Sequence, residues 1–261
     1  MYKRVLFIFL FVFVLSGIAL FYYVKPYFTP AIPQQGLNVV SHSDDTIRIA
    51  YIGDSWAHLH ESIPNIIEDS LRKQTGTPVQ VKIAGISGLT SKNIYYSLFR
   101  NETIRELIEW GPDFCVVVAG INDTNRKMGG RYYRENMKLI ISLLLHYSIT
   151  PIILEIPDYD IVASFKRGNR QTKLTFLCSM LITGSSFDCK DEYRLELIKL
   201  ISRQKWNDSI IYISRKQWNP DGYHDSRMLY DKGKMHLNTK GYIVLDTCIS
   251  NAITNYLEKL P

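Results

Sequence analysis

The chain has few cysteines, no internal repeat and no run of basic residues interleaved with aromatic ones. Only four of its 261 residues are cysteine, and their spacing is not that of a metal site. The formal net charge of +6 is a mild excess, whereas nucleic-acid-binding proteins gather basic residues into a patch. We therefore predict no metal, no cofactor and no nucleic-acid partner. Solubility explains the excess most simply, and the alternative is a preference for anionic glycans or lipid headgroups.

Charge is also absent from residues 5–24, which are almost entirely apolar. This length matches the hydrocarbon core of a bilayer. Residues 1–4 contain Lys3 and Arg4, and residues 26–40 contain no charged residue. The positive-inside rule therefore predicts a single-pass anchor with a cytoplasmic N-terminus and the remainder of the chain outside the cytoplasm.

A cleaved signal peptide is the alternative interpretation of this apolar segment. Gly17-Ile18-Ala19 has the small-x-small form of a cleavage site. The apolar run continues for several residues beyond Ala19, which favours the anchor. Both interpretations predict an exported protein, periplasmic or extracellular, and secreted if the segment is removed.

The rest of the chain divides into a tether and one domain. Residues 25–45 contain three prolines and a glycine without periodicity, so an extended tether is expected. Residues 46–261 alternate between strand and helix patterns. The expected strands are 46–52, 79–84, 113–119, 150–156 and 209–214, and the expected helices are 63–75, 91–110, 132–147, 193–204 and 239–260.

This alternation predicts a mostly parallel, flavodoxin-like sheet in a three-layer α/β/α sandwich. The near-continuous apolar run at 113–119 is typical of a parallel strand that is covered on both faces. The stretch from about residue 158 to residue 191 fits no regular unit, and it is too long for an ordinary connection between elements. We interpret them as an insertion that forms a lid or a substrate wall.

Residues that could take part in catalysis follow three of the expected strands. Ser55 lies in Gly53-Asp54-Ser55, Gly88 in Gly85-Ile86-Ser87-Gly88, and Asn122 in Gly120-Ile121-Asn122-Asp123. The carboxyl ends of parallel strands meet at one edge of the sheet, so these residues are expected to converge. His236, in Met235-His236-Leu237-Asn238, precedes the last expected helix. A serine at a strand end and a late histidine are typical of an activated-serine hydrolase.

These four segments, in this order, resemble the blocks of the SGNH (GDSL-like) hydrolase family. The resemblance implies the SGNH hydrolase fold, a serine nucleophile at Ser55 and a general base at His236. It also implies an oxyanion hole formed by Ser55, Gly88 and Asn122. Gly85 competes with Gly88 for the glycine position but fits the block less well.

The acid of the triad departs from the family pattern. Its usual place, three residues before the histidine, is occupied by Gly233. Asp231 lies five residues before His236, and a bulge at 232–234 would bring it to the imidazole. Asp221 and His224 have the usual spacing and form the alternative pair, although the expected helix does not follow them.

One disulfide is predicted. Cys178 and Cys189 bracket a loop-rich stretch, and an exported protein encounters an oxidising compartment in which they would pair. Two free thiols are the alternative. Cys115 and Cys248 lie in an expected strand and helix, so they are interpreted as core residues.

The resemblance implies a serine esterase that acts on ester groups, and the apolar N-terminal segment implies that it is exported. O-acetyl groups of envelope or extracellular carbohydrate are the expected substrates. An acyltransferase would use the same residues. A lipid hydrolase of the lysophospholipase or thioesterase kind is a second hypothesis. A catalytically degenerate fold that only binds glycan or assists an assembly is a third, and the displaced Asp231 is its main support.

Overall fold

The computed structural model describes residues 2–64 and 66–259, and the chain divides at Pro30 into two units. The first unit contains helix α1 (Tyr2–Phe28). Among the described residues, one stretch of 19 residues, Leu10–Phe28 in α1, is apolar and long enough to cross a membrane. A signal sequence has the same properties, so both interpretations of the N-terminus remain compatible with this helix.

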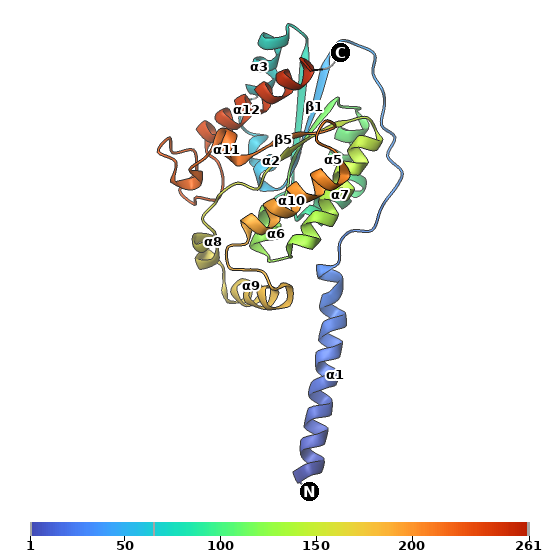
Figure 1. Ribbon diagram of the computed structural model, residues 1–261, viewed down its shortest axis with the longest axis vertical. Coiled ribbons are helices and arrows are strands. Elements are labelled where there is room, and N and C mark those ends of the chain that lie inside the picture. The colour runs from blue at the N-terminus through green and yellow to red at the C-terminus, as the bar shows by residue number, and fades with distance from the viewer. Residues whose placement is uncertain (1, 65, 260–261) are drawn as a thin grey trace. The chain divides into compact units, whose positions relative to one another are not determined.

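The second unit is built on a five-stranded parallel sheet (Figure 1). The strand order β2-β1-β3-β4-β5 is that of a doubly wound sheet. Every residue of β3 is buried, as its continuous apolar sequence predicts. The predicted α/β fold is therefore confirmed. The strands are β1 (Ile47–Gly53), β2 (Val79–Gly85), β3 (Phe114–Val118), β4 (Thr150–Leu154) and β5 (Ile211–Ile213).

Helices cover both faces of this sheet (Figure 1). On one side α12 packs against α3, and on the other α7 packs against α4 and α10. The helices of the sandwich are α2 (Ser55–His60), α3 (Ile66–Thr75), α4 (Ser91–Arg100), α5 (Glu102–Glu109), α6 (Ile121–Asn125), α7 (Gly130–His146), α10 (Lys190–Gln204), α11 (Arg215–Trp218) and α12 (Thr239–Leu257), with a 3₁₀ turn η1 (Gly222–His224).

The single helix predicted for 91–110 is wrong, because α4 and α5 are separate helices. Asn101 between them has an extended backbone, and its side chain accepts a hydrogen bond from the backbone N–H of Ile104. An asparagine that caps a helix in this way begins a new helix instead of continuing the old one. The apolar periodicity runs through both helices, so it conceals the break.

The insertion at 158–191 also differs from the prediction of an irregular segment. It contains α8 (Ile161–Arg167) and α9 (Arg170–Thr183). Asp160 and Asn169 cap them, and each side chain accepts a bond from a backbone N–H of the first turn. Several large apolar residues of α9 face solvent, so the sequence lacks the two-sided pattern by which a surface helix is recognised.

The predicted tether is only partly a linker. From Ala31 onward it belongs to the second unit, so the boundary lies at Ala31 instead of residue 46. Residues 31–40 contain no helix or strand, yet Leu37 is buried in the core. Hydrogen bonds to α4, α5 and α7 hold this segment: Ala31 N to Asn136 Oδ1 (2.8 Å), Gln34 N to Tyr95 Oη (2.8 Å), Tyr147 Oη to Leu37 O (3.1 Å) and Val40 N to Glu109 O (2.9 Å).

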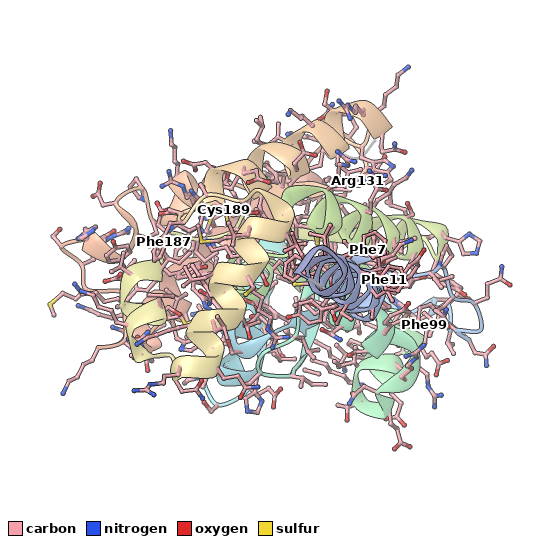
Figure 2. The ribbon with its side chains drawn as sticks, turned by 90° about the horizontal axis from the view of Figure 1, so that it is seen from below. Phe7, Phe11, Phe99, Arg131, Phe187 and Cys189 are labelled. Atoms are coloured by element: carbon pink, nitrogen blue, oxygen red, sulfur yellow. The ribbon has the colours of Figure 1, made fainter. Side chains whose placement is uncertain are left out.

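The predicted disulfide is wrong, since Cys178 and Cys189 are both free. Cys178 is exposed on α9, whereas the Sγ of Cys189 is buried 3.4 Å from the Nζ of Lys127. Lys127 also donates to the backbone oxygen of Phe187 at 2.6 Å, and Figure 2 shows Phe187 beside Cys189. The two thiols therefore point into different environments, one aqueous and one internal.

Candidate active site

The side chains of Ser55 and His236 meet at the carboxyl end of β1. Ser55 Oγ lies 3.0 Å from His236 Nε2, within hydrogen-bond distance. Ser55 is the first residue of α2, immediately after the end of β1. A Cβ on Gly53 would lie 2.5 Å from the backbone oxygen of Val118. Only glycine therefore fits where β1 passes β3 and turns toward Ser55.

The loop that carries His236 is held by backbone contacts on both sides. Tyr230 and Leu237 form an isolated antiparallel bridge, and the N–H of Asp231 donates to the oxygen of His236 at 2.9 Å. The indole N–H of Trp56, adjacent to Ser55, donates to the oxygen of Met235 at 3.1 Å. These contacts tie the histidine loop directly to α2, which sets the Ser55–His236 distance.

Asp231 reaches the other nitrogen of the imidazole. Its Oδ2 lies 3.8 Å from His236 Nδ1, because residues 232–234 turn back and the N–H of Lys234 bonds the oxygen of Asp231 at 3.0 Å. This is the bulge predicted from the sequence. The distance is that of an ion pair and exceeds a normal hydrogen bond. The carboxylate is also 42% exposed, so water screens its charge.

The environment of His236 favours the neutral imidazole. Burial lowers its pKa, Asp231 raises it, and Arg167 lowers it again, with a net lowering. A neutral imidazole can accept the hydroxyl proton of Ser55 at Nε2 when Nδ1 carries the hydrogen. The histidine is therefore in the form that a general base requires at neutral pH.

The backbone N–H groups of Ser55 and Gly88 have no partner among the described residues and could donate to a bound oxygen. The N–H of Gly85 instead donates to Glu61 Oε1 at 2.8 Å. Gly88 has a φ of +83°, a conformation that glycine adopts without strain. The geometry thus favours Gly88 over Gly85 as an oxyanion donor.

Asn122 lies at the same edge, but both hydrogens of its amide are engaged. Nδ2 donates to Asp54 Oδ2 at 3.1 Å and to the oxygen of Leu89 at 3.0 Å. An amide nitrogen has only two hydrogens. A substrate oxygen would therefore have to share one of them. These two contacts also fix the orientation of the amide.

Two buried carboxyl groups near the site were not singled out by the sequence analysis. Asp54 accepts the backbone N–H of Trp56 at 3.0 Å, and burial raises its pKa to about 7. Asp123 accepts from the N–H and hydroxyl of Ser91, and burial raises its pKa to about 6. Their only sequence signal is their position next to Ser55 and Asn122.

The alternative pair does not approach Ser55. Asp221 and His224 are both exposed, and the ring of His224 packs against Tyr223 with centroids 4.0 Å apart. No hydrogen bond between described residues connects this pair to Ser55. The structure therefore favours His236, as the sequence analysis does.

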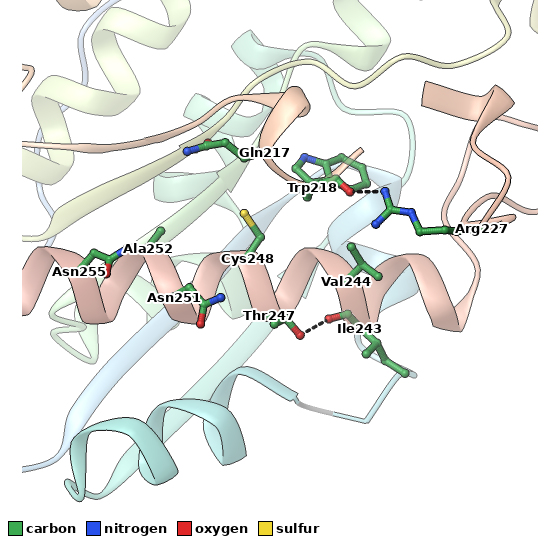
Figure 3. A pocket seen from close by; sticks show the side chains of 10 residues that line it. All are labelled: Gln217, Trp218, Arg227, Ile243, Val244, Thr247, Cys248, Asn251, Ala252 and Asn255. Atoms are coloured by element: carbon green, nitrogen blue, oxygen red, sulfur yellow. Dashed lines mark hydrogen bonds between the residues drawn. The ribbon is translucent and has the colours of Figure 1, made fainter. Parts of the chain in front are cut away.

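A separate surface pocket of about 380 Å³ lies between α11 and α12 (Figure 3). Trp218 lines it, and the ring of Trp218 also packs edge-on against Trp56 with centroids 6.1 Å apart. None of the predicted site residues lines this pocket. Within the described part of the chain, no group of three or more His, Cys, Asp or Glu is arranged to hold a metal ion.

A parallel sheet with a serine just beyond the end of β1, beside a histidine, is the arrangement found in hydrolases of α/β architecture. Residues 51–244 match the model of the GDSL-like lipase/acylhydrolase family. The chain belongs to this family and is an ester hydrolase of the GDSL type.

Solved structures show the same fold at low sequence identity. The chain is similar to a lipase/acylhydrolase from Enterococcus faecalis, with 18% identity, TM-score 0.54, and coverage of 80% of this chain and 95% of that one. An acetyl xylan esterase, AlAXEase, has 16% identity and TM-score 0.55, covering 79% and 100%. Axe2, an acetylxylan esterase from Geobacillus stearothermophilus, has 15% identity and TM-score 0.54, covering 79% and 93%. A search of curated proteins gave no match.

Proposed function

We propose that the protein is a serine esterase in which Ser55 forms an acyl-enzyme. The observation that carries this proposal is the 3.0 Å contact between Ser55 Oγ and His236 Nε2. In the first step Oγ attacks the acyl carbon while Nε2 takes its proton. The proton then passes to the departing alcohol as the ester C–O bond breaks. Water, or a sugar hydroxyl in a transfer reaction, resolves the acyl-enzyme by the same route in reverse.

The charge that develops on the carbonyl oxygen requires fixed donors. The N–H groups of Ser55 and Gly88, which have no partner among the described residues, support this role. Asn122 is the third donor in this proposal and shares one of its two engaged amide hydrogens with the substrate oxygen. In this proposal Asp231 stabilises the imidazolium that forms at His236. At 3.8 Å and partly exposed, it contributes as a charge rather than as a hydrogen-bonding partner.

O-acetyl esters of carbohydrate outside the cytoplasm are the proposed substrates. Two of the similar structures are named as acetylxylan esterases, and the apolar helix α1 favours attachment to a membrane or export. Lysine and arginine at the extreme N-terminus place the catalytic unit outside the cytoplasm in this proposal. A lipid ester is the second candidate, favoured by the exposed aliphatic residues of α9.

The first test is the hydrolysis of p-nitrophenyl acetate by the full chain in detergent. Ser55→Ala and His236→Ala should each lower kcat/KM by several orders of magnitude. Matched controls are Ser62→Ala, an exposed serine just beyond α2, and His224→Ala, which should both keep wild-type rates. If His224→Ala is inactive and His236→Ala is not, the assignment is wrong. If wild type is inert and a fluorophosphonate probe does not label Ser55, a binding function replaces the esterase.

Acetylated xylan and a lysophospholipid, offered to the active enzyme, separate the two substrate classes. Release of acetate from the polysaccharide without hydrolysis of the lipid supports the carbohydrate esterase. The opposite result supports the second candidate.

A further inference from the structure

Helices α8 and α9 expose a group of aliphatic side chains that no other part of the second unit covers among the described residues. Leu174 is 63% exposed, Leu181 85% and Ile182 57%. Val162 and Leu177 are each 46% exposed. Scattered exposed leucines are ordinary, but aliphatic residues concentrated on one short helix pair indicate an interaction surface. We call these five residues the α8–α9 apolar surface.

The helix pair is fixed from its inner side, so the exposure is not a consequence of loose packing. The rings of Phe165, Phe176 and Phe187 are mutually packed with centroids 4.8–5.4 Å apart. Phe176 is buried, and the Nζ of Lys127 lies 4.6 Å from its ring centroid. Because this side of α9 is anchored inward, the aliphatic residues on its other side must face outward.

The charge on this helix pair has a single sign. Residues 161–183 contain Lys166, Arg167, Arg170 and Lys173 and no aspartate or glutamate. Exposed aliphatic side chains with cations alone among them suit the interface of an anionic membrane, where the apolar groups enter the headgroup region and the cations meet anionic lipids. A second copy of the chain fits less well, because its cations would face these cations.

The chain enters the second unit close to the end of α9. Asn136 of α7 accepts the N–H of Ala31, the first residue of the second unit. At the other end of this stretch, a Cβ on Gly129 would contact Thr183, the last residue of α9, at 3.5 Å. Seven residues of helix span about 10 Å. The chain therefore enters the unit roughly two helical turns from the end of α9, and only two residues separate Ala31 from α1.

We propose that the α8–α9 apolar surface binds an anionic phospholipid bilayer. This rests on the anchor interpretation of α1 in the proposed function and adds a second attachment to it. Arg167 of α8 donates to the oxygen of Gly233 at 2.9 Å, in the loop that carries His236. Contact of α8 and α9 with the bilayer thus brings the loop that carries His236 to the membrane surface, where the site would meet esters attached to the membrane.

The native thiol on α9 allows a direct test with the full chain in phospholipid vesicles. Cys178 is exposed, Cys115 and Cys189 are buried and Cys248 is half-buried, so Cys248→Ser leaves one reactive position for an environment-sensitive fluorophore. The matched control carries Cys178→Ser, Cys248→Ser and Leu195→Cys, with the label on α10 at a position 50% exposed. Flotation of each chain with the vesicles reports separately on the anchor.

We expect bilayer-embedded quenchers to quench the label at position 178 and not the label at 195, in vesicles that contain phosphatidylglycerol. The double variant Leu174→Ser and Leu181→Ser should float with the vesicles yet lose this quenching. Removal of one cation should reduce by about fivefold the ratio of the affinities, measured by quenching at position 178, for vesicles with phosphatidylglycerol and for vesicles of phosphatidylcholine alone. The variants are Lys166→Gln, Arg170→Gln and Lys173→Gln.

Equal quenching at positions 178 and 195, or none at either in chains that float, overturns the proposal. The fluorophore at position 178 could instead become shielded from water as the ratio of protein to lipid rises, without being quenched by the bilayer-embedded quenchers. A second copy of the chain would then cover the surface, and this result also overturns the proposal. Chains that fail to float, but whose label at 178 is quenched when vesicles are present, refute the anchor and leave the surface intact.

Discussion

Asp231→Asn tests how much a displaced acid contributes to this site. The substitution keeps the size of the side chain and removes its charge. Asp231 Oδ2 lies 3.8 Å from His236 Nδ1 and the side chain is 42% exposed. In the proposed mechanism its main effect is therefore electrostatic, through the imidazolium that exists only while His236 holds the proton of Ser55.

The distance and the exposure determine the expected magnitude. Opposite charges about 4 Å apart attract by about 1 kcal/mol in bulk water and about 4 kcal/mol at an effective dielectric constant of 20. Screening of a partly exposed carboxylate places the value near the lower limit, at about 1–2 kcal/mol. This corresponds to a loss of about 5- to 30-fold in kcat/KM. Removing the buried, hydrogen-bonded aspartate of a protease triad costs about 10⁴.

The pH profile of kcat/KM on p-nitrophenyl acetate gives a second readout. Asp231 raises the pKa of His236, so its loss should lower that pKa. Because the base must be neutral, the acidic limb of the profile should move to lower pH while the plateau falls. Asp221→Asn, at an exposed aspartate outside the site, should change neither. A loss of a thousandfold or more, or an acidic limb that does not move, would refute this reasoning.

Three further predictions concern the groups around the catalytic pair. Asn122→Ala should lower kcat by about 10²–10³ with little change in KM, and an unchanged kcat would remove Asn122 from the oxyanion hole. Burial raises the pKa of Asp54 from 3.8 to about 7. The protonated carboxyl therefore stabilises the folded state fully below about pH 4, and this contribution is lost as pH rises through 7. The Tm of wild type should fall over this range more than that of Asp54→Asn, and parallel curves would contradict the assignment. A Cβ on Gly85 would lie 2.2 Å from the backbone nitrogen of His58, so Gly85→Ala should displace α2 and lower both Tm and kcat. In the control Gly76→Ala no atom lies within 4 Å of the added Cβ, so kcat should be unchanged.

The sheet was predictable because burial imposes its pattern directly on the sequence. Residues 114–118 are apolar without interruption since β3 is covered on both faces, and this alone distinguishes a central parallel strand. The convergence of Ser55 with the histidine loop follows from the same topology together with the family resemblance. The bulge at 232–234 was also predicted, although its outcome, a distance of 3.8 Å, depends on backbone contacts that no local pattern encodes.

The features that were missed arise where local sequence and tertiary environment disagree. The outward-facing leucines of α9 remove the contrast between its two sides, so helix periodicity could not reveal it. Cys178 and Cys189 are close in sequence, but a helix directs one outward while the other contacts Lys127. The bonds from Asn122 to Asp54 and Leu89 join segments more than thirty residues apart, and no spacing rule predicts them.

The segment from Ala31 to Val40 determines how force reaches the enzyme. Any pull from the N-terminal helix arrives first at the bond between Ala31 and Asn136, then at Gln34 and Leu37. The load is therefore distributed over α4, α5 and α7 before it reaches β1, the strand that ends beside Ser55. If α1 is a membrane anchor, a pull on it would break the hydrogen bonds of this segment in turn, beginning at Ala31, before the load reaches β1.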